Sequence, residues 1–251
     1  MTGPSTPVPL VEVHDDADAL ATAVAGELLN RLADGQAAGH VPHISLTGGT
    51  VAVKIHEEVA RLAPASGVDW GAVHVWFGDE RFVAKDSPDR NVLQARDAFL
   101  REVGVPDANV HEFPSADDVE DVDASAAAYA EELAAHWPGR FDVMMLGVGP
   151  DGHINSLFPG FPQLEATGPT AGVLGSPKPP PERVTLTFPT TCASSSVWFL
   201  VTGDGKAEAV RRAMAEEGSV PGATLAETPA RGAHGQQETV WFLDKPAASL
   251  I

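Results

Sequence analysis

The densest group of potentially reactive residues lies in residues 146–160, which read Leu-Gly-Val-Gly-Pro-Asp-Gly-His-Ile-Asn-Ser-Leu-Phe-Pro-Gly. Three glycines, Asp151 and His153 follow an apolar run, 141–146, that is typical of a buried strand. Histidine is a natural general base near neutral pH, and Asp151 could orient its ring or merely cap a turn. An isolated histidine is more often structural than catalytic, so this candidate for proton transfer depends on its neighbours.

The same segment contains a literal G-x-G-x-x-G pattern, formed by Gly147, Gly149 and Gly152. Such a pattern after a strand is typical of dinucleotide sites. Here Pro159 and Gly160 would end a following helix after about two turns, and no strand ending in an acidic residue lies about 20 residues further on. The chain also lacks the His and Cys spacing of zinc sites. We therefore expect neither a dinucleotide nor another cofactor, and no bound metal.

A second candidate is the run Leu-Thr-Gly-Gly-Thr at 46–50, at a predicted junction between a strand and a helix. Gly48 and Gly49 would let the backbone approach a ligand closely, and the free N–H groups of the new helix favour an anion. The hydroxyl of Thr50 would add a donor. An ordinary turn in which a threonine caps the helix would have the same sequence.

Charged residues supply the remaining candidates. Asp79, Glu80 and Arg81 follow the apolar run 73–77. The Arg81 fork suits phosphate or carboxylate, and the acidic pair could orient it or bind sugar hydroxyls, although a solvated turn with a local ion pair is the simpler reading. Lys178 and Arg183 lie in the proline-rich stretch 176–183, which could hold a cation over a pocket or serve as a surface spacer. Lys206 opposes the dipole of a predicted helix, which an anionic ligand would compensate.

Predicted strands and helices alternate around these motifs. The alternation favours an α/β fold with a mostly parallel, Rossmann-like sheet covered by helices on both faces. Strands are expected at 8–13, 40–46, 73–77, 109–113, 141–146, 183–186, 196–202 and 239–243, helices at 15–38, 51–63, 91–103, 121–136 and 204–214, and a loop at 163–181. We expect one domain, 8–251, after a disordered tail, 1–7, with a small appendage around 160–185.

The predicted order of elements has a consequence for the site. Ligands bind to such sheets at the carboxyl ends of the strands. Four polar, glycine-containing turns follow predicted strands, after Leu46, Phe77, Leu146 and Thr202. We therefore expect these four turns to converge on one edge of the sheet.

Composition limits the classes of function. The chain has 16 Lys and Arg residues against 35 Asp and Glu residues, a formal net charge of −19, so we expect no nucleic-acid partner. Cys192 is the only cysteine, which excludes an intrachain disulfide and fits a reducing compartment. No apolar run approaches the roughly 18 residues of a membrane span, and the start of the sequence does not read as a signal peptide. We therefore expect a cytoplasmic protein that binds no membrane. No sequence pattern reports the oligomeric state, and a monomer is our expectation.

Taken together, the motifs resemble the 6-phosphogluconolactonases over most of the chain, from about Leu10 to Leu243. The resemblance rests on Phe-Gly-Asp-Glu-Arg at 77–81 with Asn91, on 146–153 with Ser-Leu-Phe-Pro-Gly at 156–160, on 176–183 and on the turn 203–206. The family usually has Ser where this chain has Thr47, and often Pro soon after the glycines where it has Val51. The backbone amides of the turn are compatible with both changes.

The resemblance implies a fold shared with glucosamine-6-phosphate deaminases and ribose-5-phosphate isomerases, without a dinucleotide. It also implies a sugar-phosphate lactone as the small-molecule substrate. The implied catalytic residues are His153 and Asp151. The implied substrate- or phosphate-binding residues are Gly48, Gly49, Thr50, Asp79, Arg81, Asn91, Gly149, Lys178, Arg183 and Lys206.

The activity implied by the resemblance is hydrolysis of 6-phospho-D-glucono-1,5-lactone in the oxidative pentose phosphate pathway. On this hypothesis the phosphate docks on Gly49, Thr50 and Lys206, with Arg81 as a further candidate. Neutral His153 takes a proton from water, and the resulting hydroxide attacks the lactone carbonyl. Glycine N–H groups of 147–152, or a nearby cation, would stabilise the oxyanion. No metal or covalent intermediate is required.

Two alternatives remain open at this point. Hexosamine-6-phosphate deaminases and isomerases, which this chain also resembles, share the glycine turn and the Asp-Gly-His run. They differ from it by an extra glutamate soon after the histidine. This chain has no glutamate between Asn155 and Gly160. A non-catalytic sugar-phosphate-binding protein is the second alternative, and such a protein would be expected to have lost His153.

Overall fold

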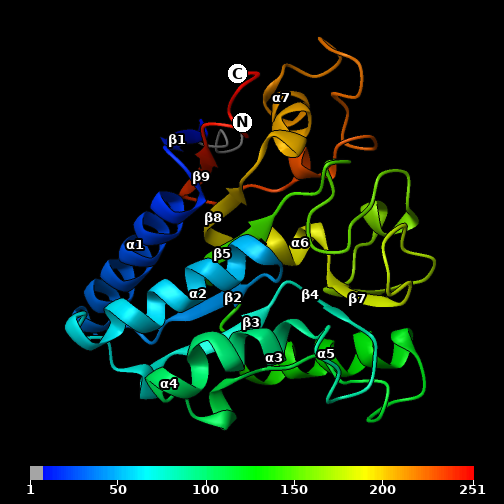
Figure 1. The fold of residues 1–251 in the computed structure, drawn as a ribbon. Coiled ribbons are helices and arrows are strands. Elements are labelled where there is room, and N and C mark those ends of the chain that lie inside the picture. Colours follow the sequence, from blue (N-terminus) through cyan, green and yellow to red (C-terminus); the bar gives the residue numbers. More distant parts are fainter. Residues whose placement is uncertain (1–7) are drawn as a thin grey trace, which may run out of the picture.

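The computed structural model describes residues 8–251, so the expected disordered tail, 1–7, lies outside the described residues. Six parallel strands form the main sheet in the order β1-β9-β8-β5-β2-β3 (Figure 1). Their bounds are β1 Leu10–His14, β2 His43–Leu46, β3 His74–Phe77, β5 Phe141–Gly147, β8 Ser194–Val201 and β9 Glu238–Asp244. The predicted α/β fold with a parallel sheet is confirmed.

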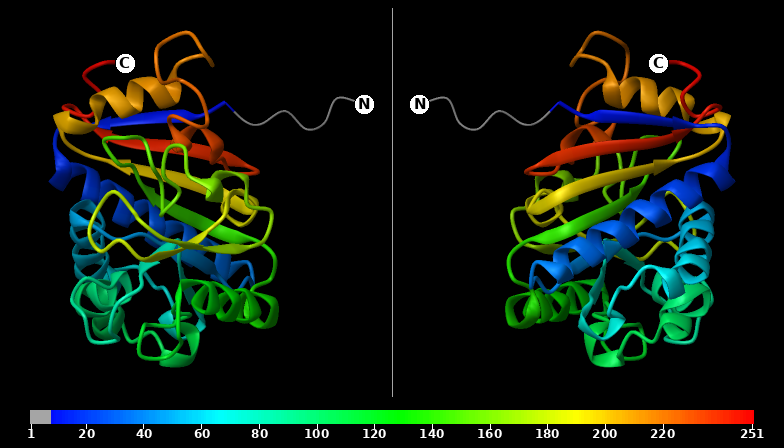
Figure 2. Two further views of the ribbon diagram at one scale, coloured as in Figure 1. Left: turned by 90° about the vertical axis from the view of Figure 1, so that its right-hand side faces the viewer. Right: turned by 90° about the vertical axis from the view of Figure 1, so that its left-hand side faces the viewer.

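Helices connect these strands. They are α1 Ala17–Ala37, α2 Thr50–Leu62, α3 Asn91–Ala95, α4 Arg101–Val103, α5 Val122–His136, α6 Phe188–Thr191 and α7 Ala207–Met214, and a π-helical turn at Arg96–Leu100 joins α3 to α4. Asp16 and Asp121 begin the two longest helices because their carboxylates accept N–H groups of the first turn. Figure 2 shows α1 crossing one face of the sheet, whereas β6, β7 and their loops lie over the other. Within residues 8–251, no helix has the length and apolar character needed to span a lipid bilayer.

A second, antiparallel sheet was not predicted. It consists of β4 Asp79–Arg81, β7 Arg183–Leu186 and β6 Thr170–Val173, in the order β4-β7-β6. Residues 79–81 were predicted as part of a turn and 163–181 as a loop. The strands β4 and β6 within these segments are short and lack apolar alternation, and β4 pairs with a strand about a hundred residues away. Local sequence patterns therefore give no sign of the pairing.

One expected strand is absent. Residues 109–113 make only an isolated bridge, between Val110 and Val75, and one further bond from the His111 N–H to the Val75 carbonyl. A tight turn at Asp107–Asn109 precedes the segment, and Pro114, which has no N–H group, ends it. The prediction of a strand was therefore wrong.

Two buried features of the core matter later. His56 of α2 is 3% exposed, packs against Phe99, and has no hydrogen-bond partner at either ring nitrogen. Strand β9 lies between β1 and β8, and Asp244 at its end accepts hydrogen bonds from the N–H groups of Gly203 and Ala247.

Candidate active site

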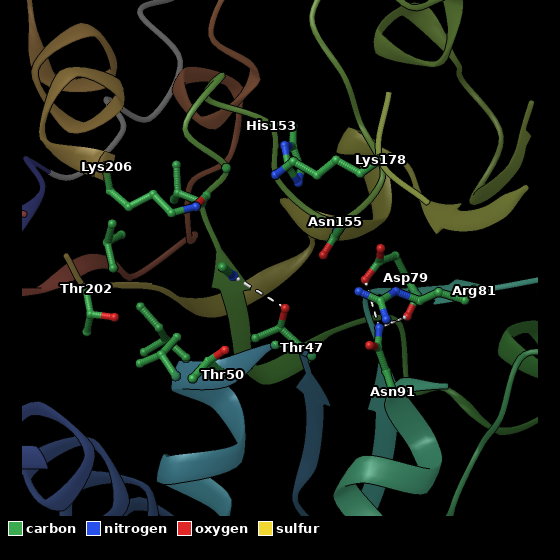
Figure 3. A pocket seen from close by; sticks show the side chains of 18 of the residues that line it. Thr47, Thr50, Asp79, Arg81, Asn91, His153, Asn155, Lys178, Thr202 and Lys206 are labelled. Atoms are coloured by element: carbon green, nitrogen blue, oxygen red, sulfur yellow. Dashed lines mark hydrogen bonds between the residues drawn. The ribbon is translucent and has the colours of Figure 1, made fainter. Parts of the chain in front are cut away.

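A pocket opens at the carboxyl edge of the main sheet, where the four predicted turns meet (Figure 3). All residues predicted for the site line it, except Asp151 and Glu80. Residues that were not predicted also line it, namely Thr47, Val51, Gly147, Val148, Asn155, Leu200, Val201 and Thr202. Chain segments from residue 47 to residue 206 thus contribute to one cavity.

His153 is held in one orientation by Asp151 and Gly149. Its Nδ1 lies 2.5 Å from Asp151 Oδ1. An ionised carboxylate only accepts hydrogen bonds, so Nδ1 carries the proton and Nε2 of the neutral ring is free to accept one. Burial alone would raise the pKa of Asp151, but the hydrogen bond and the charge of His153 lower it to about 2. The Asp151 carboxylate is therefore ionised at neutral pH and can accept the Nδ1 proton of His153 in a hydrogen bond.

The ring and the carboxylate both rest on the α-carbon of Gly149. A Cβ at this position would lie 2.0 Å from His153 Nδ1 and 2.2 Å from Asp151 Oδ1, so only glycine fits. Phe158 also packs against the imidazole, with ring centroids 4.6 Å apart and the two rings tilted. Gly152, at a φ of +89°, turns the chain between the two residues of the pair.

The glycine amides of this loop are already bonded within the chain. The N–H of Gly149 donates to the carbonyl of His153 at 2.8 Å, and that of Gly152 donates to the carbonyl of Gly149 at 2.9 Å. The N–H of Gly147 faces Thr47 Oγ1 at 3.4 Å. The expected contribution of Gly149 to ligand binding, and the hypothesis that these glycines hold an oxyanion, are therefore not supported, and cations are the remaining candidates.

The start of α2 forms the corner of the pocket that the sequence predicted to bind an anion. Gly49 occupies the N-cap position at a φ of +97° with no side-chain cap, and Thr50, which the sequence left open as a capping threonine, is the first helical residue. The first N–H groups of this 13-residue helix are thus left for a ligand. Lys206 reaches the same cavity from the turn after β8, and its Nζ donates to the Val148 carbonyl at 2.6 Å. Burial and the nearby charge of Lys178 lower the pKa of Lys206, against the opposing effect of Asp151.

Arg81 and Arg183 lie opposite each other in the pairing of β4 with β7. Arg81 Nη1 donates to the Asp89 carbonyl at 2.6 Å. Arg183, 4% exposed, donates through Nε and Nη2 to the carbonyls of Lys178, Pro179 and Pro180. Burial lowers the pKa of Arg183, while Asp79 opposes that effect. Arg183 thus fixes the proline-rich loop that carries Lys178 over the pocket, as shown in Figure 3.

Glu80 does not reach the pocket, although the sequence offered it as a ligand-binding residue. It is 1% exposed and accepts the backbone N–H groups of Arg81, Asn91 and Val92 at 2.7–3.0 Å. Arg90, also 1% exposed, lies 3.8 Å away. Burial raises the pKa of Glu80 to about 7, even though Arg90 and the three N–H groups act in the opposite direction. The Glu80 carboxylate therefore holds the start of α3 against β4.

Sequence reasoning missed Asn155, Thr202 and the buried Arg90. Asn155 has a φ of +47°, a conformation that asparagine tolerates better than most residues, so its type was the only signal available. No motif or hydrophobic pattern in the sequence marks Thr202 or Arg90 as part of the site or its support. Among residues 8–251, no three His, Cys, Asp or Glu side chains are arranged to hold a metal ion.

Comparison with known proteins gives consistent matches. Residues 15–241 match the family model described as glucosamine-6-phosphate isomerases/6-phosphogluconolactonase. The 6-phosphogluconolactonase of Streptomyces coelicolor is 41% identical over 97% of this chain and 95% of its own, and that of Mycobacterium tuberculosis is 42% identical over 96% and 98%. The structure of the 6-phosphogluconolactonase of Trypanosoma brucei superposes with a TM-score of 0.79 at 26% identity, covering 98% of this chain and 99% of that one.

Proposed function

The chain belongs to the glucosamine-6-phosphate isomerase/6-phosphogluconolactonase family, and we propose that it hydrolyses 6-phospho-D-glucono-1,5-lactone to 6-phosphogluconate. The observation that carries the proposal is the His153–Asp151 pair, whose acceptor nitrogen is available in a pocket that also offers an uncapped helix start and Lys206. We further propose that the enzyme acts as a monomer, since one chain supplies this whole set of residues. A cytoplasmic location is proposed on the single cysteine, which fits a reducing compartment.

The phosphate is proposed to dock between the start of α2 and Lys206. The N–H groups at Gly49 and Thr50 and the Thr50 hydroxyl are donors, and the helix dipole favours a negative charge there. Lys206 adds a cation whose pKa burial and Lys178 lower, and a bound dianion would act in the opposite direction by favouring its charged form. Figure 3 shows Lys206, Thr202 and Thr50 on one side of the pocket and Arg81 and Asn91 on the other.

His153 is proposed to act on water. Nε2 of the neutral ring takes a proton from water as its oxygen attacks C1 of the lactone, and the positive charge that develops on the imidazole is stabilised by ionised Asp151. The tetrahedral oxyanion faces cations, of which Lys178 and Arg81 are the lining residues beside His153 and β4. The imidazolium then returns its proton to the ring oxygen as the C1–O bond breaks, which gives the open hydroxy acid, and its carboxyl group loses a proton to solvent to form 6-phosphogluconate.

The first experiment measures hydrolysis of freshly generated lactone in EDTA, as the excess over a blank without protein. Wild type should exceed the blank strongly, and His153→Asn should lower kcat by about 10²–10⁴-fold with little change in KM. Lys206→Met should instead raise KM, because it removes a phosphate contact and leaves the His153–Asp151 pair in place. A His153→Asn enzyme near wild-type activity would refute the assignment of the base.

The same experiment separates the alternatives. A folded wild-type protein that gives no excess hydrolysis but converts glucosamine 6-phosphate would be a deaminase or isomerase. One that binds sugar phosphates without turnover would be a binding protein. The segment after His153 offers a deaminase or isomerase no supporting carboxylate, because Asn155, Ser156 and Leu157 follow where a glutamate would be needed. A non-catalytic binding protein would be expected to have lost His153, which is present.

A further inference from the structure

Two side-chain oxygens in the wall of the pocket have no hydrogen-bond partner. They are Oδ1 of Asn91, whose residue is 2% exposed, and Oδ1 of Asn155, whose residue is 7% exposed. Both residues line the cavity, on the side away from Lys206 (Figure 3). A buried acceptor without a partner is costly, so two of them in one cavity indicate that a ligand completes them.

The orientation of Asn91 is fixed by its neighbours. Its Nδ2 donates to the backbone carbonyl of Asp79 at 2.9 Å and to Asp79 Oδ1 at 3.2 Å. Ser156 donates to Asp79 Oδ2 at 2.7 Å and so holds the carboxylate in place. Since Asp79 can only accept at these atoms, turning the Asn91 amide over would set oxygen against oxygen. Asn91 must therefore keep its carbonyl oxygen free, and Asp79 acts as a positioning residue.

Asn155 is placed by a different set of contacts. Its Nδ2 donates to Thr191 Oγ1 at 3.4 Å, and Thr191 is not among the residues that line the cavity. Its backbone has a φ of +47°. Both amide oxygens lie where only glycine leaves room, because a Cβ on Gly48 would be 1.9 Å from Asn91 Oδ1, and one on Gly78 would be 2.3 Å from Asn155 Oδ1.

We propose that the amide oxygens of Asn91 and Asn155 accept hydrogen bonds from ring hydroxyl groups of the substrate, and thereby select it. This inference rests on the proposed function. The phosphate and the lactone carbonyl of that substrate only accept hydrogen bonds, whereas the hydroxyls at C2, C3 and C4 donate them. Two acceptors therefore match the hydroxyl-bearing edge of the ring. They also leave the carbonyl to the cations near His153.

The selection follows from the amide oxygen that a substrate without the matching hydroxyl would leave unpaired. A lactone without the matching hydroxyl would keep one acceptor buried and unpaired, and sites built around such a bond discriminate strongly against the analogue that lacks it. A lactone with the hydroxyl in the opposite configuration would point it away from the acceptor. The pocket should therefore prefer a particular hydroxyl pattern and not sugar-phosphate lactones in general.

The test combines variants with altered substrates. Asn155→Gly removes the acceptor, and glycine adopts the left-handed backbone of this position without strain. Asn91→Ala removes the second acceptor, and Asn109→Ala is a matched control, because that amide bonds to the Gly71 carbonyl away from the pocket. Each protein is assayed with 6-phosphogluconolactone and with its 2-deoxy, 3-deoxy and 4-deoxy analogues, and its affinity for 6-phosphogluconate is measured by calorimetry.

We expect Asn155→Gly to lower kcat/KM for the parent lactone about fivefold or more, the value for one net hydrogen bond. With the deoxy lactone that lacks the hydroxyl bound by Asn155, Asn155→Gly and wild type should have equal kcat/KM. Asn91→Ala should likewise equal wild type with one deoxy lactone, the one that lacks the hydroxyl bound by Asn91. An equal loss with all four lactones would overturn the inference, because it would show a merely structural role. No loss with any lactone and no loss of 6-phosphogluconate affinity would overturn it as well.

The outcome for wild type keeps the two proposals apart. Wild type that hydrolyses the parent lactone while the variants fail to discriminate would refute only the role of the asparagines. Wild type that hydrolyses no lactone would refute the proposed function. In that case the calorimetric comparison of wild type with Asn155→Gly still decides whether Asn155 contacts a hydroxylated sugar phosphate.

Discussion

Replacing Gly149 by alanine would place one methyl group where His153 and Asp151 rest on the backbone. The added carbon would lie 2.0 Å from His153 Nδ1 and 2.2 Å from Asp151 Oδ1, far inside van der Waals contact. To restore an ordinary contact of 3.4 Å, the imidazole has to move by about 1.4 Å. Phe158 packs against the same ring with centroids 4.6 Å apart, so a shift of this size also disturbs that contact and takes His153 out of its place in the pocket.

The expected loss follows from that displacement. Misplacing a catalytic group by 1 Å can cost about 10²-fold in rate, and losing the general base altogether costs about 10²–10⁴-fold. We therefore expect Gly149→Ala to lower kcat by about 10²–10⁴-fold, close to the effect of removing His153 itself. KM should change little, because the start of α2 and Lys206 are untouched. Overpacking of this kind costs about 1–3 kcal/mol of stability, which a folded domain can tolerate.

The assay is lactone hydrolysis above the uncatalysed blank, with circular dichroism and a thermal melt to show that the variant is folded. Gly205→Ala is the control, because its Cβ would meet no atom within 4 Å in a turn at the same edge of the sheet. A folded Gly149→Ala enzyme with kcat within threefold of wild type would refute the reasoning, since the His153–Asp151 pair would then not depend on its position over this glycine.

Two further predictions concern stability. Burial lowers the pKa of His56 to about 4, so below about pH 6.5 the unfolded chain binds a proton that the folded chain refuses, and stability falls as the pH drops toward 4. His56→Leu should therefore gain about 3 kcal/mol relative to wild type between pH 7.5 and pH 4 in urea titrations, and a constant difference would contradict this. Arg90→Met should cost about 3–5 kcal/mol by leaving Glu80 buried without its cation. Burial raises the pKa of Glu80 to about 7, so the unpaired carboxylate is more often charged at pH 8 than at pH 6, and the loss of stability should be larger at pH 8. Urea titrations at the two pH values measure this loss, and a larger loss at pH 6 would contradict the prediction.

The sequence predicted the meeting of distant segments well, and the reason is topological. A parallel sheet has one carboxyl edge, so polar turns that follow apolar strands must share it, whatever their order in the chain. The turns after β2, β3, β5 and β8 therefore enclose one pocket. The same logic needs no side-chain detail, which is why the motif at 146–153 and the turn at 46–50 could be placed together.

The partners of individual polar atoms could not be predicted in the same way. Glu80 and Arg81 are adjacent in the sequence, yet one binds backbone amides in the interior and the other lines the pocket. The alternation of side chains along β4 decides this, and β4 exists only through its pairing with β7. The amides of Gly149 and Gly152 looked free in the sequence and are bonded within their own loop. Such outcomes depend on three-dimensional contacts that no local pattern contains.

The position of β9 in the sheet determines how late in synthesis this enzyme can complete its fold. In the main sheet, β1 pairs with β9 alone, so Leu10 finds its partner Val240 only after nearly the entire chain has been made. The turn that carries Lys206 waits as well, because Asp244 at the end of β9 accepts the Gly203 N–H. Contacts between residues so far apart in the sequence are slow to form. During synthesis β1 must therefore remain unpaired until β9 leaves the ribosome. A chain truncated before residue 238 would lack both β9 and the support of the turn that carries Lys206.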